Sequence, residues 1–410
     1  MIDCAVIGAG QAGLATSYHL SRIGVEHLVL ERGRVAETWR GARWDSFHLN
    51  TPNWCTQLPG LDLSGADPDA FAPRDEVVRM FEGYADDIGA PVRTGDVTAL
   101  RSQSGAFSLE LADDTLAARS VVVATGAFQQ PLANRASNDT PHGVLQMHTS
   151  TYRKPGDLPD GGVLIVGSGQ SGCEIGLELI EGGRDVHLAV GRCGWFPRRY
   201  RGRELMRWMV DVGVAEETPE VLPTPAARVA GNVVVSGSRG GRDCNALVLE
   251  RAGARLYGRF EGFEDGRAHF ASDLEDSLEF GRTFEANLSR RCDAWVEATG
   301  TALPPAVAEA ERPARDHDPT ELELDREGVK TVLWAGGFRP AFSWIELPIL
   351  DELGFPRATR GVSEVPGLAF VGLPWLYKRK SPLLLGVGED AAFVADAVAA
   401  HLAGESQPST

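Results

Sequence analysis

The chain has 410 residues, of which 43% are hydrophobic and 24% are charged, and these proportions are ordinary for a globular protein. Because a single core usually stops growing at about 250–300 residues, this length predicts two domains. The formal net charge of −17 disfavours nucleic acids and anionic membrane surfaces as partners, since both are polyanions. No apolar run approaches the roughly 20 residues that span a bilayer, and no basic segment followed by an apolar core opens the chain, so we expect a cytoplasmic protein.

Six cysteines are spread along the chain, and none of them forms a Cys-x-x-Cys pair. This spacing argues against a dithiol redox centre and against the usual zinc site. We therefore expect reduced, buried or incidental thiols, as in a cytoplasmic protein, and no metal site.

The first predicted unit is a strand over residues 2–7, a helix over residues 11–23 and a strand over residues 28–30. Between the first strand and the helix stands Gly8-Ala9-Gly10-Gln11-Ala12-Gly13, the glycine pattern of a dinucleotide-binding turn. The first two glycines let the backbone turn tightly and approach a pyrophosphate. The third lets the helix pack on the strand and direct its N-terminal amides at the anion.

Short strands are predicted next, over residues 91–100 and 107–111. A fully buried strand over residues 119–124 follows and ends at a turn of small residues, Thr125-Gly126. Residues 154–162 are rich in proline and glycine and predict a linker between two halves of the chain.

A second glycine fingerprint, Gly167-Ser168-Gly169-Gln170-Ser171-Gly172, follows an apolar strand over residues 163–166 and opens another helical pattern. One such fingerprint alone is weak evidence. Two in the correct context predict that one chain binds two dinucleotides.

The residue after each second strand indicates which dinucleotide binds where. Glu31 follows the first fingerprint by about 20 residues, where a carboxylate binds ribose hydroxyls, and it favours an unphosphorylated ribose such as that of FAD. After the second fingerprint, Gly191 stands at the place of the acid and Arg192 stands beside it. A guanidinium binds the 2′-phosphate that a carboxylate would repel, so we expect NADPH there. A solvated surface side chain is the alternative at both Glu31 and Arg192.

Four arginines form a positive cluster on this acidic protein, at Arg198, Arg199, Arg201 and Arg203. The contrast in charge suggests that the cluster binds an anion, most simply the NADPH phosphates beside Arg192. A solvated basic face is the alternative.

Further along, apolar positions over residues 288–296 recur at helical spacing, so Ala298-Thr299-Gly300 is predicted to end a helix. A second cofactor turn is the alternative for these three residues. Buried strands are predicted over residues 329–334 and 367–372, and an amphipathic helix over residues 390–401.

These elements predict an α/β fold with two Rossmann-like dinucleotide-binding domains, one inserted within the other. The FAD domain takes residues 1–157 and 326–405, and the NADPH domain takes residues 161–325. Residues 406–410 are expected to be a disordered tail.

The chain resembles the class B, FAD- and NADPH-dependent flavoprotein monooxygenases, in particular the bacterial group described as potassium-transport-associated flavoproteins. The likeness covers nearly the whole chain. Besides the two fingerprints it rests on Thr38-Trp39-Arg40 with Arg43, Trp44-Asp45-Ser46, Leu49-Asn50-Thr51-Pro52, His148 with Tyr152, the run from Pro197 to Arg203, and Phe338-Arg339-Pro340 followed by Ser343-Trp344-Ile345.

The resemblance implies that residues 37–59 wrap the flavin, and that Asn53 and His48 are the candidate catalytic residues. Asn53 is also compatible with a structural turn. For FAD we expect contacts from Gly8, Gly10, Gln11, Gly13, Glu31, Arg32, Thr38, Trp39, His48, Thr51, Val97, Thr125 and Gly126. For NADPH we expect contacts from Gly167, Gly169, Gln170, Ser171, Gly172, Arg192 and Arg198.

Three departures from the family pattern bear on the chemistry. Tyr152 stands where Baeyer–Villiger members usually carry tryptophan, and Gly143 precedes His148 by one residue more than the family fingerprint specifies, so conversion of ketones to esters is disfavoured. The family's Ala-Thr-Gly-Tyr turn is replaced by Ala335-Gly336-Gly337-Phe338.

The resemblance implies an NADPH-consuming monooxygenase that forms a C4a-peroxyflavin and oxygenates a nitrogen, sulfur or carbon atom of a small organic substrate, with O2 as co-substrate. The sequence leaves the substrate and the oligomeric state open, a homodimer among the possibilities. The alternatives are an NADPH-dependent flavoprotein reductase or dehydrogenase without oxygen insertion, and a nicotinamide-sensing flavoprotein.

Overall fold

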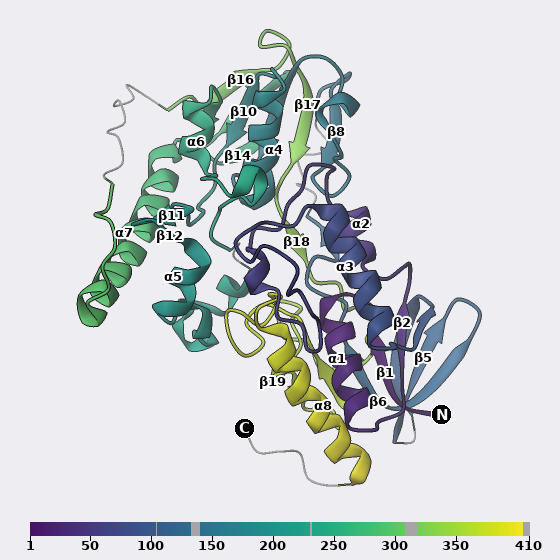
Figure 1. The fold of residues 1–410 in the computed structure, drawn as a ribbon. Helices are drawn as coiled ribbons and strands as arrows, with labels where there is room; N and C mark the ends of the chain where they lie inside the picture. The colour runs from purple at the N-terminus through teal and green to yellow at the C-terminus, as the bar shows by residue number, and fades with distance from the viewer. Residues whose placement is uncertain (104, 133–139, 230–231, 308–317, 405–410) are drawn as a thin grey trace.

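Two α/β halves make up the molecule, each built on its own sheet (Figure 1). The computed structural model describes residues 1–103, 105–132, 140–229, 232–307 and 318–404. The tail predicted at 406–410 lies outside these residues. Within the described part of the chain, no helix is both long enough and apolar enough to cross a membrane.

The first half contains a nine-stranded sheet in which β19, β20, β21, β6, β1, β2 and β3 lie in this order, with β4 and β5 continuing from β6. The central strands β21, β6, β1, β2 and β3 are parallel, and β1 and β6 are largely buried because apolar residues fill them. The strands span Ile2–Ile7 (β1), His27–Glu31 (β2), Val92–Thr94 (β3), Val97–Gln103 (β4), Ala106–Leu111 (β5), Thr115–Val123 (β6), Ala358–Thr359 (β19), Val362–Ser363 (β20) and Leu368–Phe370 (β21).

The second half contains a five-stranded parallel sheet in the order β13, β10, β9, β17, β8. It occupies the upper part of Figure 1, whereas β1 and β6 lie at the lower right. Its strands span Leu145–His148 (β8), Gly162–Val166 (β9), Val186–Ala189 (β10), Arg255–Tyr257 (β13) and Val329–Trp334 (β17).

Strands β8 and β17 belong to the second half, whereas the predicted domain division assigned their residues to the first domain. In the structure β17 pairs with β9, with Val332 opposite Leu164, and β8 pairs with the other edge of β17. The strand β17 joins the second sheet because its apolar residues complete a core with that sheet, in which Val332 and Leu164 are both fully buried. The chain crosses between the halves at the antiparallel pair formed by β7 (Gln130–Pro131) and β18 (Phe338–Arg339).

Helices cover both sheets. In the first half α1 packs along α8, and Figure 1 shows the two helices side by side. In the second half α4 packs against β9, β10 and α6. The helices span Gln11–Arg22 (α1), Glu37–Gly41 (α2), Arg74–Asp87 (α3), Gln170–Glu181 (α4), Leu205–Asp211 (α5), Ala246–Arg251 (α6), Leu274–Thr299 (α7) and Val387–Ala403 (α8).

The long helix α7 confirms the helical interpretation of residues 288–300. It ends at Gly300, whose φ of 65° is the left-handed conformation that glycine adopts at helix C-termini. The Ala-Thr-Gly run there is therefore a helix end and not a cofactor turn. The remaining short strands form two small sheets and span Arg199–Tyr200 (β11), Arg203–Glu204 (β12), Phe260–Glu264 (β14), Arg267–Phe270 (β15) and Glu321–Glu323 (β16).

Candidate functional site

The two glycine fingerprints have nearly the same local geometry. The first glycines, Gly8 and Gly167, have φ values of 109° and 114°, which side chains rarely tolerate. A Cβ atom on Gly13 would lie 1.8 Å from the carbonyl oxygen of Gly8, and one on Gly172 would lie 2.0 Å from that of Gly167. Glycine is therefore required at both places so that the helix can pack closely on the preceding turn.

The middle glycines leave open space in front of both helices. Gly10 is the N-cap of α1 and Gly169 is the N-cap of α4, and neither helix has a side-chain hydrogen bond capping its first turn. In the described part of the chain, and apart from the residues adjacent to each glycine, no atom lies within 4 Å of a Cβ built on either of them. Because the first amides of a helix carry a partial positive charge and need acceptors, each N-terminus is suited to a pyrophosphate. The residues present thus fit two dinucleotides.

Each fingerprint lies against the end of a neighbouring strand. A Cβ on Gly8 would meet the carbonyl oxygen of Ala124 at 2.7 Å, and one on Gly167 would meet that of Ala335 at 2.6 Å. The turn at Ala335-Gly336-Gly337 is therefore the counterpart, in the second half, of Ala124-Thr125-Gly126 in the first. Sequence reasoning missed this equivalence because it placed the strand before Ala335 in the wrong half.

Glu31 lies at the end of β2, where the sequence places a ribose ligand. Its carboxylate accepts hydrogen bonds from the backbone N–H groups of Ala9 (2.8 Å) and Gly33 (3.0 Å), and so it also shapes the first glycine turn. In the second half the hydroxyl of Ser168 has the corresponding role, because it accepts a hydrogen bond of 3.1 Å from the N–H of Gly191.

Arg32 and Arg192, the residues beside these turns, are exposed. Within the part of the chain that the structure describes, no hydrogen bond or ion pair of the Arg192 guanidinium is found. Its position beside the second fingerprint leaves this guanidinium able to bind a 2′-phosphate.

The glutamines of the two fingerprints contact distant segments. Gln11 donates a hydrogen bond to the carbonyl oxygen of Pro382, just before α8. Gln170 donates to the carbonyl oxygen of Val235, accepts a 3.2 Å hydrogen bond from the N–H of the same residue, and donates at 2.8 Å to the carboxylate of Glu174. Burial raises the pKa of Glu174 to about 8, although hydrogen bonds from Ser236 and Gln170 oppose the shift.

The predicted flavin segment starts with α2. Thr38 on this helix is exposed, whereas Trp39 is half-buried and stacks on Phe81 with ring centroids 6.1 Å apart. Beyond the helix, Nδ1 of His48 lies 2.8 Å from the carbonyl oxygen of Ser46. Thr51 follows in the same loop and is half-buried.

Asn53 has the contacts of a structural turn residue. Its side-chain amide donates a 2.9 Å hydrogen bond to the carbonyl oxygen of Asp67, and its backbone N–H donates to that of Ala70. These contacts connect two loops and leave the catalytic alternative for Asn53 without support from the geometry.

The other predicted site residues lie close to their fingerprints. Thr125 Oγ1 accepts a 2.7 Å hydrogen bond from Gln129, which sequence reasoning did not single out, and the Gly126 carbonyl accepts another at 2.6 Å. Val97 is buried at the start of β4, and Ser171 is half-buried in the first turn of α4.

The surroundings of Arg198 contradict its predicted contact with an NADPH phosphate. Only 1% of the residue is exposed, and its guanidinium donates to the carbonyl oxygen of Asn50 at 2.7 Å and to the carboxylate of Glu204 at 2.6 Å. The guanidinium carbon also lies 4.3 Å from the ring centroid of Phe71. A guanidinium enclosed in this way has no open side for a phosphate, so the predicted contact is wrong.

The rest of the arginine cluster is also occupied by partners within the chain. Arg201 pairs with Asp293 and Arg203 pairs with Asp211. Arg199 donates hydrogen bonds to the backbone carbonyls of residues 240–241. These three arginines are thus part of the folded framework of the second half, and Arg192 is left as the candidate phosphate ligand.

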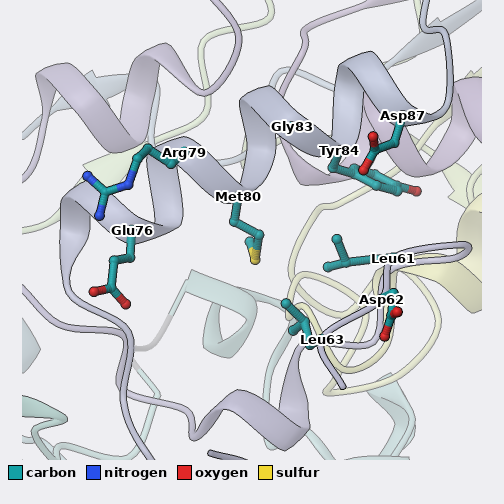
Figure 2. Close-up of a pocket in the computed structure, with 9 residues that line it drawn as sticks. All are labelled: Leu61, Asp62, Leu63, Glu76, Arg79, Met80, Gly83, Tyr84 and Asp87. Carbon is teal, nitrogen blue, oxygen red and sulfur yellow. The ribbon is translucent and has the colours of Figure 1, made fainter. Parts of the chain in front are cut away.

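A surface cavity of about 340 Å³ lies away from both fingerprints, between α3 and the loop at Leu61–Leu63 (Figure 2). In this view Met80 of α3 points toward the loop, and Tyr84 lies further along the same helix. No predicted cofactor residue lines the cavity, so we do not assign it to the reaction.

Comparisons with known proteins agree with this geometry. Residues 5–208 match the family model described as pyridine nucleotide-disulphide oxidoreductase. An uncharacterized CzcO-like oxidoreductase of Geobacillus kaustophilus is 31% identical over 405 residues, which are 98% of this chain and 99% of the relative. Indole-3-pyruvate monooxygenase YUCCA1 of Oryza sativa is 27% identical over 312 residues, covering 72% of this chain and 75% of the relative.

Among solved structures, the flavin-containing monooxygenase from Stenotrophomonas maltophilia has a TM-score of 0.67 at 19% identity and covers 98% of both chains. This likeness confirms the predicted fold with two dinucleotide-binding domains. The predicted cofactors, FAD and NADPH, agree with those of a structural neighbour, OTEMO, which was solved in complex with FAD and NADP. The chain is an enzyme of the flavin-dependent monooxygenase or oxidoreductase type, and it belongs to the class B flavoprotein monooxygenase family.

Proposed function

We propose that this enzyme is an NADPH-dependent monooxygenase that transfers one oxygen atom of O2 to a small organic substrate. One observation supports it above all: a single chain carries two uncapped, glycine-lined helix N-termini, one beside Glu31 and one beside Arg192. A chain that binds both a flavin and a phosphorylated nicotinamide is equipped to collect electrons from one and use them on the other.

FAD is assigned to the first half and NADPH to the second. The amides at the N-terminus of α1 hold the FAD pyrophosphate, and Glu31 accepts hydrogen bonds from its ribose hydroxyls. At α4 the corresponding amides hold the NADPH pyrophosphate, and Arg192 binds its 2′-phosphate. When bound and reduced, the flavin supplies the reaction with O2 that oxygenates the substrate.

The protein contributes positioning and the exclusion of water. Aromatic groups gather at the flavin segment, where Trp39 of α2 packs against Phe47 and against Phe81 of α3. A dry site favours oxygen transfer to substrate over release of hydrogen peroxide. The first turn of α8 lies beside the flavin segment, since a Cβ atom built on Gly388 would stand 3.2 Å from Pro59, and this helix N-terminus would offer its positive end to an anionic reduced ring.

A reductase would share with the proposed monooxygenase the electron transfer from NADPH to the flavin, but it would not insert oxygen into a substrate. Substrates are to be screened with ¹⁸O2, and one labelled oxygen atom in the product is the result that the proposal expects. The reoxidation of the NADPH-reduced enzyme by O2 is followed by absorbance in the same experiment. Reoxidation in two phases supports oxygen transfer, whereas a single phase with one hydrogen peroxide per NADPH, and no label in any product, would favour the reductase.

A nicotinamide sensor would bind both dinucleotides without turnover. Anaerobic addition of NADPH would then leave the flavin absorbance unchanged. This single result would exclude both the monooxygenase and the reductase.

We further propose a cytoplasmic location, which six free cysteines support because reduced thiols persist in that compartment. A homodimer stays a prediction, to be checked by light scattering of the purified protein.

A further inference from the structure

Arg198 connects the two halves of the molecule across the interface between them, which we call the seam. It precedes β11 in the second half, and its guanidinium reaches the backbone carbonyl of Asn50 in the flavin segment of the first half. The other end of the guanidinium pairs with Glu204, whose carboxylate also caps α5 by accepting a 2.7 Å hydrogen bond from the N–H of Met206. The contact is buried, because the Arg198 side chain is 2% exposed and that of Glu204 is 13% exposed.

The seam continues through a close approach of two backbones. Gly237 of the second half lies so near the flavin segment that a Cβ atom would stand 1.8 Å from the carbonyl oxygen of Leu49. Its φ of −86° and ψ of −12° suit any residue, so glycine is needed there for space and not for conformation. Phe71 fills the remaining gap, because it lies under the Arg198 guanidinium and within 3.1 Å of the same built atom.

Residues 235–237, which include Gly237, are also bound to the second fingerprint. Gln170, in the first turn of α4, exchanges hydrogen bonds with the backbone of Val235, two residues before Gly237. A short chain of contacts therefore runs from the helix N-terminus assigned to NADPH, through residues 235–237, to the loop assigned to FAD.

We infer that Arg198 is a positioning residue for electron transfer from NADPH to FAD. It holds the loop at 48–51 against the second half, so that the two dinucleotides are presented to each other at a fixed distance and angle. The inference rests on the proposed electron transfer and needs no oxygen insertion. Because misplacement by about 1 Å can slow a reaction about 100-fold, a loosened loop is expected to slow flavin reduction without loss of either dinucleotide.

The test uses two variants, each of which disturbs a different contact between the halves. Arg198→Gln removes the ion pair and shortens the reach to Asn50, and Gly237→Ala pushes Leu49 away while Arg198 stays intact. Arg199→Gln is the matched control, since the hydrogen bonds that the Arg199 side chain donates within the described residues go to backbone carbonyls of the second half. Four quantities are measured: hydrogen–deuterium exchange of residues 47–54 without cofactors, FAD content, NADPH affinity, and the anaerobic rate of flavin reduction at saturating NADPH.

Both seam variants are expected to exchange faster at residues 47–54 and to reduce flavin about 10- to 100-fold more slowly, with FAD content and NADPH affinity near wild type. Arg199→Gln should match wild type in all four measurements. Should Arg198→Gln fail to fold, Gly237→Ala decides alone.

Three outcomes overturn the inference: unchanged exchange, faster exchange with an unchanged reduction rate, or a loss confined to NADPH affinity. The second would make the contact merely structural, and the third would make Arg198 a ligand. If NADPH fails to reduce the wild-type flavin at all, the proposed function fails instead, and the exchange data still show whether Arg198 holds the loop.

Discussion

The hydroxyl of Ser46 donates a 2.7 Å hydrogen bond to the carboxylate of Glu178, and it thereby joins the flavin segment of the first half to α4 of the second. The other oxygen of this carboxylate accepts a 2.7 Å hydrogen bond from the hydroxyl of Tyr152, a fully buried residue next to the linker. One carboxylate thus binds both the flavin segment and the linker to the helix whose N-terminus is assigned to NADPH.

Replacing Glu178 by alanine should destabilise the protein by about 1–3 kcal/mol, because it leaves the buried Tyr152 hydroxyl without its acceptor. Tyr152→Phe should cost less, since Glu178 keeps its contact with Ser46 and no buried hydroxyl remains. Urea unfolding of both variants and of the double variant measures the difference. Equal losses in the two single variants would contradict this account.

Substitution at the middle glycines should separate the two dinucleotide sites. Gly169→Ala introduces a methyl group that meets no protein atom within 4 Å, so the chain is expected to fold normally. The methyl group would occupy the space assigned to the NADPH pyrophosphate, and NADPH affinity should fall by about tenfold or more, equivalent to about 1.4 kcal/mol.

Gly10→Ala is the matched variant in the first half, and it should lower FAD content while NADPH affinity is retained. Both affinities are measured by fluorescence titration. If Gly169→Ala releases FAD, or Gly10→Ala weakens NADPH selectively, the assignment of the two halves is reversed.

Arg192 should determine the preference for NADPH over NADH. Its guanidinium is exposed beside the second fingerprint, so Arg192→Ala removes a charged hydrogen-bond donor without disturbing the core. Hydrogen bonds to charged groups contribute about 1.5–3 kcal/mol, which predicts an NADPH affinity lower by about 10- to 150-fold and an NADH affinity close to wild type. Steady-state kinetics with both coenzymes measures this ratio, and equal losses for the two would exclude Arg192 from the phosphate site.

Local patterns in the sequence predicted the elements whose cause is local. The glycine fingerprints, the strands that precede them and the end of α7 at Gly300 all follow from residues within a few positions of one another. The positions of β8 and β17 did not, because a buried apolar strand can pair with either sheet and only the assembled core decides between them.

The role of Arg198 also depends on distant partners. The residues that enclose its guanidinium, Asn50, Phe71 and Glu204, come from two halves of the chain, and two of them precede it by more than 120 positions. Four arginines close together in sequence indicate an exposed positive patch, because several of the acidic and aromatic residues that pack against them in the fold are far away in the sequence. A sequence alone does not show that such partners meet.

Ionic strength should affect a further contact between the halves, which is a partly exposed ion pair. The side-chain nitrogens of Lys378 and Lys380, which precede α8, each lie 2.6 Å from the carboxylate of Glu216 in the second half. Burial opposes ionisation of Glu216, but the hydrogen bonds from the two lysines outweigh it and lower its pKa. Because the Glu216 side chain is about half exposed, Glu216→Gln should cost only about 1 kcal/mol.

The loss should shrink in high salt, which screens exposed charges. Glu364→Gln is the control, since Glu364 is mostly exposed and lies 3.9 Å from Arg357. Thermal unfolding at low and high salt compares the two variants. A loss for Glu216→Gln that does not depend on salt would show that the contact is not electrostatic.

Glu174 should make the stability of the protein fall as the pH rises. Burial raises the pKa of its carboxyl to about 8, whereas its value in the unfolded chain is near 4.5, and the charges of Arg242 and Arg43 offset the shift only in part. Between these two pH values the folded protein holds a proton that the unfolded chain has lost. The contribution of this proton is complete below the unfolded pKa and is lost as the pH rises through the folded one.

Glu174→Gln removes the titration and keeps an acceptor for the hydrogen bond from Gln170. The Tm of the variant should therefore stay close to that of wild type near pH 5 and exceed it by several degrees at pH 8, since about 1 kcal/mol corresponds to 2–4 °C or less in a chain of this size. Thermal unfolding across this range measures the difference. Parallel curves for the two proteins would mean that Glu174 is already ionised in the folded state, held by its arginine neighbours.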